Sequence, residues 1–264
     1  MIVLTQKLTL PHRIDAGALV PAALAGLSLA QIEALSLKTG LKVGDVFTVA
    51  KSDGDVVVFR TQDQAVDCIG EGMGEGEIRV EGPAGRYAGR SMSGGTLHIV
   101  GDAGDGAGQG KSGGLLVVAG KAGDFVGSAL PGRTSGVSGG VILIKGSVGQ
   151  RFGDRMRKGV MIALGDAGDF CAARAVAGTI WVRGRLGQAP AQGLKRATLL
   201  LEHAPDALPT FQDCGVVEMP VLRLLLPSLD RLAGTRVADS SDYRAHRHLG
   251  CIGVDGRGEV LVLA

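Results

Sequence analysis

The chain has 264 residues, of which 45% are hydrophobic, 20% charged and only 3% aromatic, and its net charge is +2. Glycine is the outlier at 44 residues, but it does not recur at every third position, so a collagen triple helix is excluded. The apolar content excludes wholesale disorder, and no apolar run predicts a membrane span or a signal peptide. The four cysteines lack a CxxC spacing and are typical of free thiols in a cytoplasmic protein.

Residues 1–76 predict an N-terminal cap. Ser28 and Gln31 fit a capping box at the start of a short helix that reaches about Leu35. Residues 46–59 alternate apolar positions around an Asp-Gly dipeptide, and this pattern predicts a β-hairpin.

A glycine repeat dominates residues 77–190. One glycine recurs with steps of 19, 19, 26, 19 and 19 residues, at positions 82, 101, 120, 146, 165 and 184. A second glycine lies three residues after each of these and a third lies six residues before each. In the first four copies another follows by seven. The unit is therefore G-x5-G-x2-G-x3-G, and the longer step adds seven residues in the loop-forming stretch 129–138.

The segments between paired glycines alternate in one phase. Apolar residues hold the second and fourth positions, from Ile78 and Val80 in the first copy to Ile180 and Val182 in the last. A strand this short cannot bury its apolar face alone, whereas stacked copies can. The pattern predicts an all-β fold, a parallel β-helix of about six 19-residue coils with short helical and hairpin flanks. A flat sandwich of hairpins is the alternative, and it gives no reason for the phase to persist.

The outward-facing strand positions change along the chain. Glu77, Arg79 and Glu81 give the first coil a solvated face, whereas the middle coils carry an apolar stripe. The stripe consists of Leu115, Val117, Val141, Leu143, Val160 and Ile162. An apolar stripe of this size needs a cover. Two covers are open, the chain's own termini or a partner protein.

Residues 191–264 predict a C-terminal segment that packs on the solenoid and caps it. The apolar stretches Leu222–Leu226 and Leu229–Leu232 fit against the coils, and Glu259–Leu263 predicts a closing strand. Because the ends of a solenoid expose strand edges, both flanks are expected to cap the repeats within one domain.

Groups suited to catalysis are scarce. His246-Arg-His248 is the only histidine cluster, and it lacks cysteine or carboxylate partners at metal-ligand spacing, so no metal site is predicted. Asp105, Asp124 and Asp169 each follow the second glycine of a repeat, and we interpret them as Asx-type turn residues rather than general acids or bases. The sequence thus predicts no catalytic residue in this chain.

Charge is concentrated in the repeats. Residues 77–196 have a net charge of +8, whereas the two ends are each −3. A row of cations along a solenoid suits a polyanion or an acidic protein partner. The near absence of aromatic side chains argues against single-stranded nucleic acid and against a polysaccharide-cleaving β-helix.

The repeated coil resembles the GXGXG-type domain at the C-terminal end of the glutamate synthase large chain. The same domain forms the C subunit of formylmethanofuran dehydrogenase and of the related bacterial formyltransferase/hydrolase complex. The lead-in also resembles that of the C subunit, with a helix around Ile32–Leu35, then Gly40, then Gly44-Asp-Val-Phe47. Leu41 stands where the family usually has Asn. The resemblance covers residues 27–190, and the composition favours the bacterial complex.

This resemblance implies a right-handed β-helix that is a non-catalytic, cytoplasmic scaffold without metal or covalent cofactor. Its implied partners are an amidohydrolase-like A subunit, a B subunit and a formyltransferase D subunit, with no nucleic acid and no membrane. In this family the complex moves a formyl group from formyl-tetrahydromethanopterin to a methanofuran-type carrier and hydrolyses it to formate. The alternatives are the C subunit of a molybdenum or tungsten formylmethanofuran dehydrogenase and a stand-alone β-helix binding module.

The family's carriers have glutamate-rich tails, which are polyanions. We therefore expect a set of basic side chains to hold such a tail. The set is Arg151, Arg155, Arg157, Lys158, Arg183 and Arg185.

Overall fold

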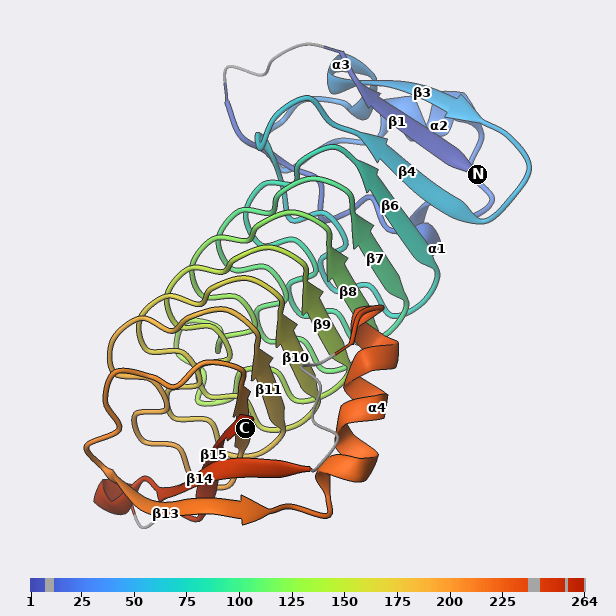
Figure 1. The fold of residues 1–264 in the computed structure, drawn as a ribbon. Helices are drawn as coiled ribbons and strands as arrows, with labels where there is room; N and C mark the ends of the chain where they lie inside the picture. Colours follow the sequence, from blue (N-terminus) through green and yellow to red (C-terminus); the bar gives the residue numbers. More distant parts are fainter. Residues whose placement is uncertain (8–11, 237–242, 255, 264) are drawn as a thin grey trace.

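The computed structural model describes residues 1–7, 12–236, 243–254 and 256–263. Most strands belong to one 13-stranded sheet with the order β13-β14-β15-β12-β11-β10-β9-β8-β7-β6-β4-β1-β3 (Figure 1). From β4 to β12 the neighbouring strands are parallel, and the chain completes one coil between each pair. This is a parallel β-helix, so the predicted fold class is confirmed and the sandwich of hairpins is excluded.

The repeating strands lie in register along the stack. They are β4 (Val56–Arg60), β6 (Glu77–Glu81), β7 (Thr96–Ile99), β8 (Leu115–Val118), β9 (Val141–Ile144), β10 (Val160–Ala163), β11 (Thr179–Val182) and β12 (Thr198–Leu201). Ile78 lies beside Leu97, which lies beside Leu116, so each inward side chain stacks on its equivalent in the next coil. These inward rows are fully buried, as the alternation predicts.

The ladder extends one coil beyond the predicted repeat at each end. Strand β4 pairs with β6, and β12 pairs with β11, so eight strands stack rather than six. The glycine signature fails at these coils because Thr61 stands at the position of Gly82, and Ala197 at that of Gly178. The division at residues 76 and 190 remains a prediction, and the sheet runs through both positions.

The predicted hairpin at residues 46–59 is wrong. Strand β3 (Phe47–Lys51) does not pair with β4, because β1 (Ile2–Gln6) lies between them. Strand β1 is antiparallel to β3 and parallel to β4, and four of its five residues are buried. The Asp-Gly turn fixes only local geometry, whereas this apolar strand gives both neighbours a partner from far along the chain.

Short elements complete the N-terminal cap. They are α1 (Pro21–Leu24), α2 (Leu29–Ala34), α3 (Val43–Val46) and the parallel pair β2 (Ile14–Asp15) and β5 (Val66–Asp67). The predicted capping box starts α2, since Ser28 Oγ accepts from the Gln31 N–H and Gln31 Oε1 accepts from the Ser28 N–H. Phe47 and Phe59 pack edge to face with centroids 6.0 Å apart and join the cap to the first coil.

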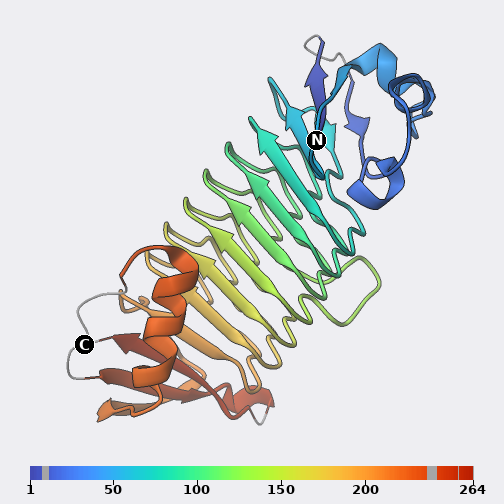
Figure 2. The same ribbon diagram turned by 90° about the vertical axis from the view of Figure 1, so that its right-hand side faces the viewer.

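The long step between β8 and β9 leaves the stack as a loop, as predicted for residues 129–138 (Figure 2). The coil then returns to the register that it left, because Leu116 still lies beside Ile142. The loop therefore adds surface to one side of the solenoid without disturbing the core.

Helix α4 (Leu222–Ala233) covers the apolar stripe (Figures 1 and 2). Its buried face consists of Leu222, Leu226, Leu229 and Ala233, a spacing that places them on one side of a helix. This face packs on the outward side chains of successive strands: Val117, Leu143, Ile162, Trp181 and Leu200. Of the two covers that the sequence left open, the chain's own C-terminal segment is the one that lies on the stripe.

The C-terminal strands change direction and end the solenoid. Strand β15 (Gly258–Leu263) is parallel to β12 and confirms the predicted closing strand. It is antiparallel to β14 (Arg244–Gly250), which is antiparallel to β13 (Phe211–Glu218). A single 3-10 turn, η1 (Ile252–Val254), lies between β14 and β15. Within the described residues, no helix has both the length and the apolar character to span a membrane.

Candidate functional site

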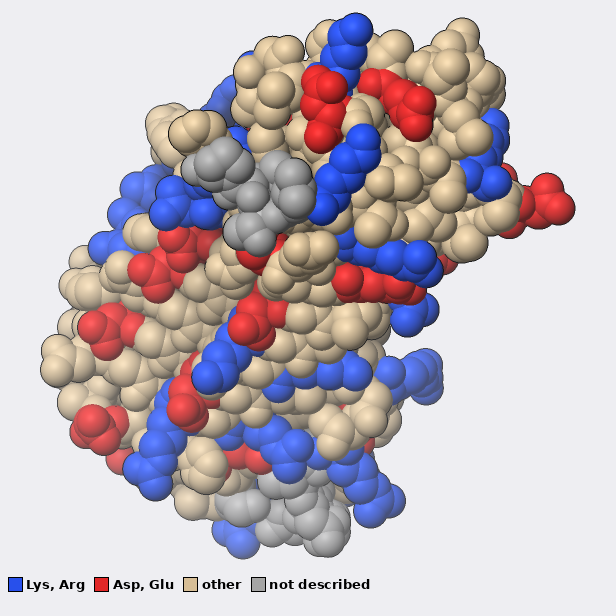
Figure 3. Space-filling view, turned by 90° about the horizontal axis from the view of Figure 1, so that it is seen from above, with Lys and Arg blue, Asp and Glu red and all other residues tan. Residues whose placement is uncertain are grey.

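The six cations expected to bind an anion do not form one face. Arg183 and Arg185 flank the corner that follows β11, whereas Arg157 and Lys158 come directly before β10. On the face shown in Figure 3, Lys and Arg side chains lie among Asp and Glu side chains rather than in one uniform patch.

Arg183 and Arg185 lie apart from the other cations. Arg183 pairs with Glu202, with Nε 3.4 Å from Oε2. Arg185 borders a separate hollow of about 270 Å³ together with His203 and Asp206. These two arginines already have acidic neighbours within the chain.

Arg151 and Arg155 lie together in a groove of about 470 Å³ beside the loop between β8 and β9. We call it the arginine groove. Its lining consists of Tyr87, Gln109, Phe125, Ser128, Ala129, Leu130, Pro131, Arg133, Arg151, Asp154, Arg155 and Arg174. These residues come from five successive coils, so the groove runs along the axis of the solenoid. Arg133 and Arg174 were missing from the sequence-based set.

Left-handed backbone recurs at the corners of the solenoid, and non-glycine residues outside the groove, such as Ser91, Phe170 and Ala189, also adopt it. Tyr87, Phe125, Arg151, Arg155 and Arg174 all have left-handed backbone, with φ between 55° and 63°. Glycine takes equivalent positions in other coils, at residues 106, 110 and 193. A large side chain with positive φ costs about 1 kcal/mol relative to glycine. The groove therefore differs from the other corners in the arginine side chains that it brings together rather than in its backbone conformation.

The groove has an excess of positive charge. Asp154 is buried and accepts from Arg174, with Nε 2.9 Å from Oδ1, and Arg151 lies 4.0 Å from the same carboxylate. The Arg151 guanidinium also stacks 4.8 Å from the centre of the Phe170 ring. Four arginines thus face one carboxylate, and among the described residues no carboxylate pairs with Arg133 or Arg155.

A buried amide completes the lining. Gln109 is 7% exposed, and its Nε2 donates to Ser128 Oγ at 2.9 Å. Its Oε1 is buried and has no hydrogen-bond partner among the described residues. A buried acceptor without a donor is costly. The excess of arginine over carboxylate in the groove therefore fits a ligand that brings carboxylates.

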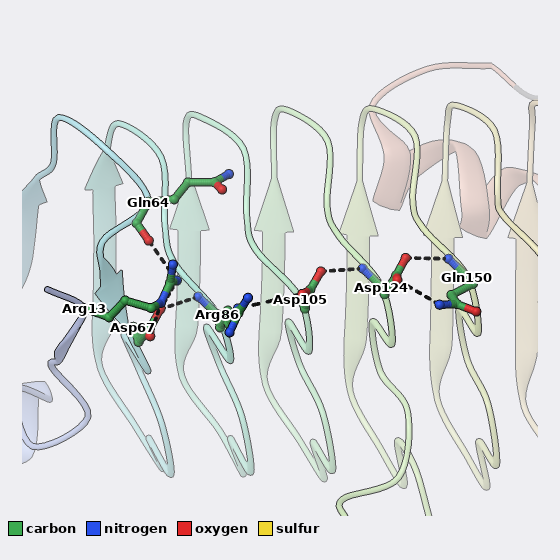
Figure 4. Close-up of polar contacts among 7 residues, drawn as sticks. All are labelled: Arg13, Gln64, Asp67, Arg86, Asp105, Asp124 and Gln150. Carbon is green, nitrogen blue, oxygen red and sulfur yellow. Dashed lines mark hydrogen bonds and ion pairs between the residues drawn. The ribbon is translucent and has the colours of Figure 1, made fainter.

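A second polar row is purely structural. We call it the aspartate ladder, and it consists of Asp67, Asp102, Asp105, Asp124, Asp166 and Asp169 (Figure 4 shows three of these). Each Oδ1 accepts from a backbone N–H of the next coil, as Asp105 does from Asp124 and Asp124 does from Gln150, both at 3.0 Å. The expected local Asx turns are wrong for Asp105, Asp124 and Asp169, because their bonds join coils.

The second glycine of the repeat makes room for this ladder. A Cβ at Gly149 would lie 2.0 Å from Asp124 Oδ1, and a Cβ at Gly187 would lie 2.3 Å from Asp169 Oδ1. Glycine is required because the carboxylate of the coil below passes through the space that any side chain would fill. The repeat thus encodes coil-to-coil bonding rather than a reaction site.

The sequence did not predict one further cluster, which joins a carboxylate to two histidines. Asp213 on β13 lies beside the predicted histidine pair on β14, with its Oδ1 2.6 Å from His246 Nε2. The carboxylate lies 33 residues before His246 in the chain, and only the pairing of β13 with β14 brings it close. Burial, followed by the neighbouring His246, lowers the pKa of His248.

Comparisons with known proteins agree with this fold. A chain of the X-ray crystal structure of the formyltransferase/hydrolase complex FhcABCD from Methylorubrum extorquens, in complex with methylofuran, superposes with a TM-score of 0.93. That chain is 37% identical, and the match covers 99% of both chains. Among curated proteins, the C subunit of the Fhc complex of Methylorubrum extorquens is 38% identical over 80 residues, which span 29% of this chain and 30% of that protein. No family model matches the chain.

Proposed function

Because the chain belongs to the family of the C subunits of formyltransferase/hydrolase complexes, we propose that it is the non-catalytic scaffold of such a complex. The match over 99% of both chains carries this proposal. The proposed complex moves a formyl group from formyl-tetrahydromethanopterin to a methanofuran-type carrier and hydrolyses it to formate. Its other components are an amidohydrolase-like A subunit, a B subunit and a formyltransferase D subunit, and the location is the cytoplasm.

The chemistry of the coils supports a scaffold. The aspartates of the ladder, which are the repeated acids of the chain, are held in coil-to-coil hydrogen bonds. Burial raises the pKa of the Cys68 and Cys171 thiols to about 12, so neither thiol is a nucleophile at neutral pH. A solenoid whose repeated acids bond successive coils together is suited to holding other subunits at fixed positions.

Purification of the tagged chain from its native cells in mild salt tests the scaffold role. We expect formyltransferase and amidohydrolase-like subunits in the eluate, formyl transfer by the eluate, and none by the chain alone. Molybdenum or tungsten in the eluate would instead identify a formylmethanofuran dehydrogenase. A chain that elutes without partners would contradict the scaffold role and leave the stand-alone module.

The arginine groove is the proposed site for the carrier's glutamate-rich tail. Arg151 and Arg155 would bind carboxylates directly, with Arg133 and Arg174 beside them. The other cations, Arg157, Lys158, Arg183 and Arg185, would add long-range attraction. The support for this site is the excess of arginine over carboxylate among the residues that line the groove.

Paired charge reversal tests the groove in the assembled complex. We expect Arg151→Glu with Arg155→Glu to weaken the carrier's apparent affinity by about tenfold or more, because two charge-assisted bonds become repulsive. Arg183→Glu with Arg185→Glu should have a smaller effect that disappears at high salt. Arg196→Glu, an exposed cation outside the groove, is the matched control. An unchanged affinity in the groove variant would reject the site while leaving the scaffold role intact.

A further inference from the structure

Three side chains that can ligate a metal meet on the paired strands β13 and β14. Figure 1 shows these two strands at the C-terminal end of the solenoid. Asp213 lies on β13, and His246 and His248 lie two residues apart on β14, so both imidazoles are on one face of the strand. Asp213 pairs with His248 across the two strands. One ligand atom from each of the three lies within 4.8 Å of the others.

The backbone is shaped to aim Asp213 at the histidines. The register of β13 shifts between Asp213 and Val216, which is a β-bulge opposite the histidines. Asp213 Oδ1 accepts from the Gly215 N–H at 2.7 Å, and Gly215 has a left-handed φ of 70°. Bulges of this kind re-aim a side chain next to a functional site.

An ion pair alone does not explain the cluster. One histidine is enough to pair with Asp213, and His246 does so. His248 stacks on His246 with ring centroids 4.6 Å apart and an interplanar angle of 16°. No hydrogen bond to the His248 imidazole occurs among the described residues, although this ring lies next to a carboxylate and a second imidazole. The pair between His246 and Asp213 therefore leaves the His248 imidazole unused.

We propose that Asp213, His246 and His248 bind a divalent transition metal of the Zn²⁺ class. Two imidazole nitrogens and one carboxylate oxygen suit Zn²⁺, Co²⁺ or Ni²⁺, whereas Mg²⁺ and Ca²⁺ prefer oxygen ligands alone. Metal–ligand bonds of about 2.0–2.2 Å place tetrahedral ligands about 3.3 Å apart, so the His246–Asp213 contact must open slightly. The side chains of His246 and Asp213 are 41% and 63% exposed, which leaves room for that movement and for water at the remaining positions.

A second cluster of possible metal ligands differs from this one, because cations of the protein already pair with its carboxylates. Asp15, Cys68 and Glu71 also approach one another. Lys38 Nζ lies 2.9 Å from Asp15 Oδ2, and Arg90 donates to Glu71, so protein cations already neutralise both carboxylates. Among the described side chains, Asp213 pairs only with histidine. Metal binding there would fasten β13, the outermost strand of the sheet, to β14.

Titration of the metal-free full chain with Zn²⁺ tests the proposal. We expect one Zn²⁺ per chain, a higher unfolding midpoint with metal bound, and visible absorption bands when Co²⁺ replaces Zn²⁺. His246→Gln and His248→Gln should each weaken binding by about tenfold or more, and Asp213→Asn should do the same while keeping the shape of the carboxylate. The partial exposure of these side chains lets the variants fold, and their metal-free unfolding midpoints check this.

Two control variants separate this site from adventitious binding. His203→Gln changes an exposed histidine elsewhere, and Cys214→Ser removes the thiol next to Asp213. Both should bind Zn²⁺ as the parent chain does. The proposal is overturned if the parent chain shows no saturable binding. It is equally overturned if the histidine variants bind as tightly as the parent, or if Cys214→Ser alone abolishes binding.

Discussion

The aspartate ladder and the arginine groove occupy the same coils and use the same 19-residue spacing, yet they follow opposite rules. In the ladder, each carboxylate bonds a backbone N–H of the next coil, and the glycine above it makes room. In the groove, arginine and aromatic side chains hold left-handed positions that glycine would hold without strain. The ladder is explained within the chain, whereas the groove is not.

This contrast separates repeat residues that build the solenoid from residues that the solenoid presents. Gln150 shows the first kind, because its N–H and Nε2 both donate to Asp124. Arg155 shows the second kind, because its left-handed backbone brings a cation to the groove. An arginine that has no carboxylate partner among the described residues is available to a ligand or a partner.

The largest loss of stability is expected at a glycine that makes room for a ladder carboxylate. Gly149→Ala places a Cβ 2.0 Å from Asp124 Oδ1 and 2.9 Å from its backbone nitrogen, so the coils must separate. We expect a loss of about 3 kcal/mol in unfolding free energy, measured by denaturant titration. Gly132→Ala is the matched control, because nothing lies within 4 Å of its Cβ and only its φ of 76° is strained. Equal losses in the two variants would contradict the role of close approach.

Lys111 is a polar residue inside the core row, where Met92 and Val137 are its neighbours in adjacent coils. Burial lowers its pKa from 10.5 to about 8. Between these values the unfolded chain binds more protons than the folded chain, so stability rises as the pH rises from about 8 to 10.5. Lys111→Met should remove this rise and raise stability at pH 7 by about 2 kcal/mol, allowing for partial solvation of the ammonium.

Parallel denaturant titrations at pH 7 and pH 10 measure the effect of Lys111→Met. An unchanged pH dependence would show that Lys111 does not titrate in this window. A destabilised variant at pH 7 would show that the ammonium is fully satisfied in the folded chain.

Removal of one aspartate from the ladder should lower the unfolding free energy by less than the Gly149→Ala substitution does. Asp124→Ala loses the bonds to the Gln150 N–H and Nε2, at 3.0 and 2.9 Å. We expect a loss of about 1.5 kcal/mol, because these charge-assisted bonds are accessible to water. Asp206→Ala, an exposed acid outside the ladder, should lie within about 0.5 kcal/mol of the parent chain. If Asp124→Ala loses no more unfolding free energy than this control does, the ladder does not stabilise the chain.

The smallest change in stability is expected in the groove, where the substitution should stabilise the chain rather than destabilise it. Arg155→Gly relieves a left-handed φ of 60°, so the chain should gain about 0.5 kcal/mol while the complex loses affinity for the carrier. Thermal unfolding and carrier binding measured on the same preparation check both halves. A destabilised Arg155→Gly chain with unchanged carrier binding would make Arg155 a structural residue.

The regular part of the fold could be predicted from the sequence because its apolar and glycine positions recur in every copy. The inward alternation of Ile78 with Val80 and the glycine phase fix the strand, the corner and the stacking direction of every coil that carries them. The outer coils were missed because Thr61 and Ala197 replace glycines. The insertion of β1 between β3 and β4 depends on contacts about 50 residues apart, which local alternation does not encode.

The candidate sites could be predicted only in part, because several of their residues lie outside the repeat. Arg155 and Arg174 are one period apart, and this spacing would have placed them side by side in the groove. Arg133 belongs to the loop outside the repeat, so no periodicity predicts its position. Asp213 and His246 meet through a β-bulge and an antiparallel pairing, neither of which their sequence spacing shows.

Reconstitution of the complex from separated subunits, with and without this chain, tests the scaffold role most directly. Native mass spectrometry reports which subunits assemble, and the formyl transfer rate reports whether the assembly works. We predict that the chain enters a defined assembly with its partners, and that omitting it leaves the other subunits apart with little coupled transfer. Partners that assemble and transfer formyl groups equally well while this chain stays a free 26.9 kDa species would contradict the account.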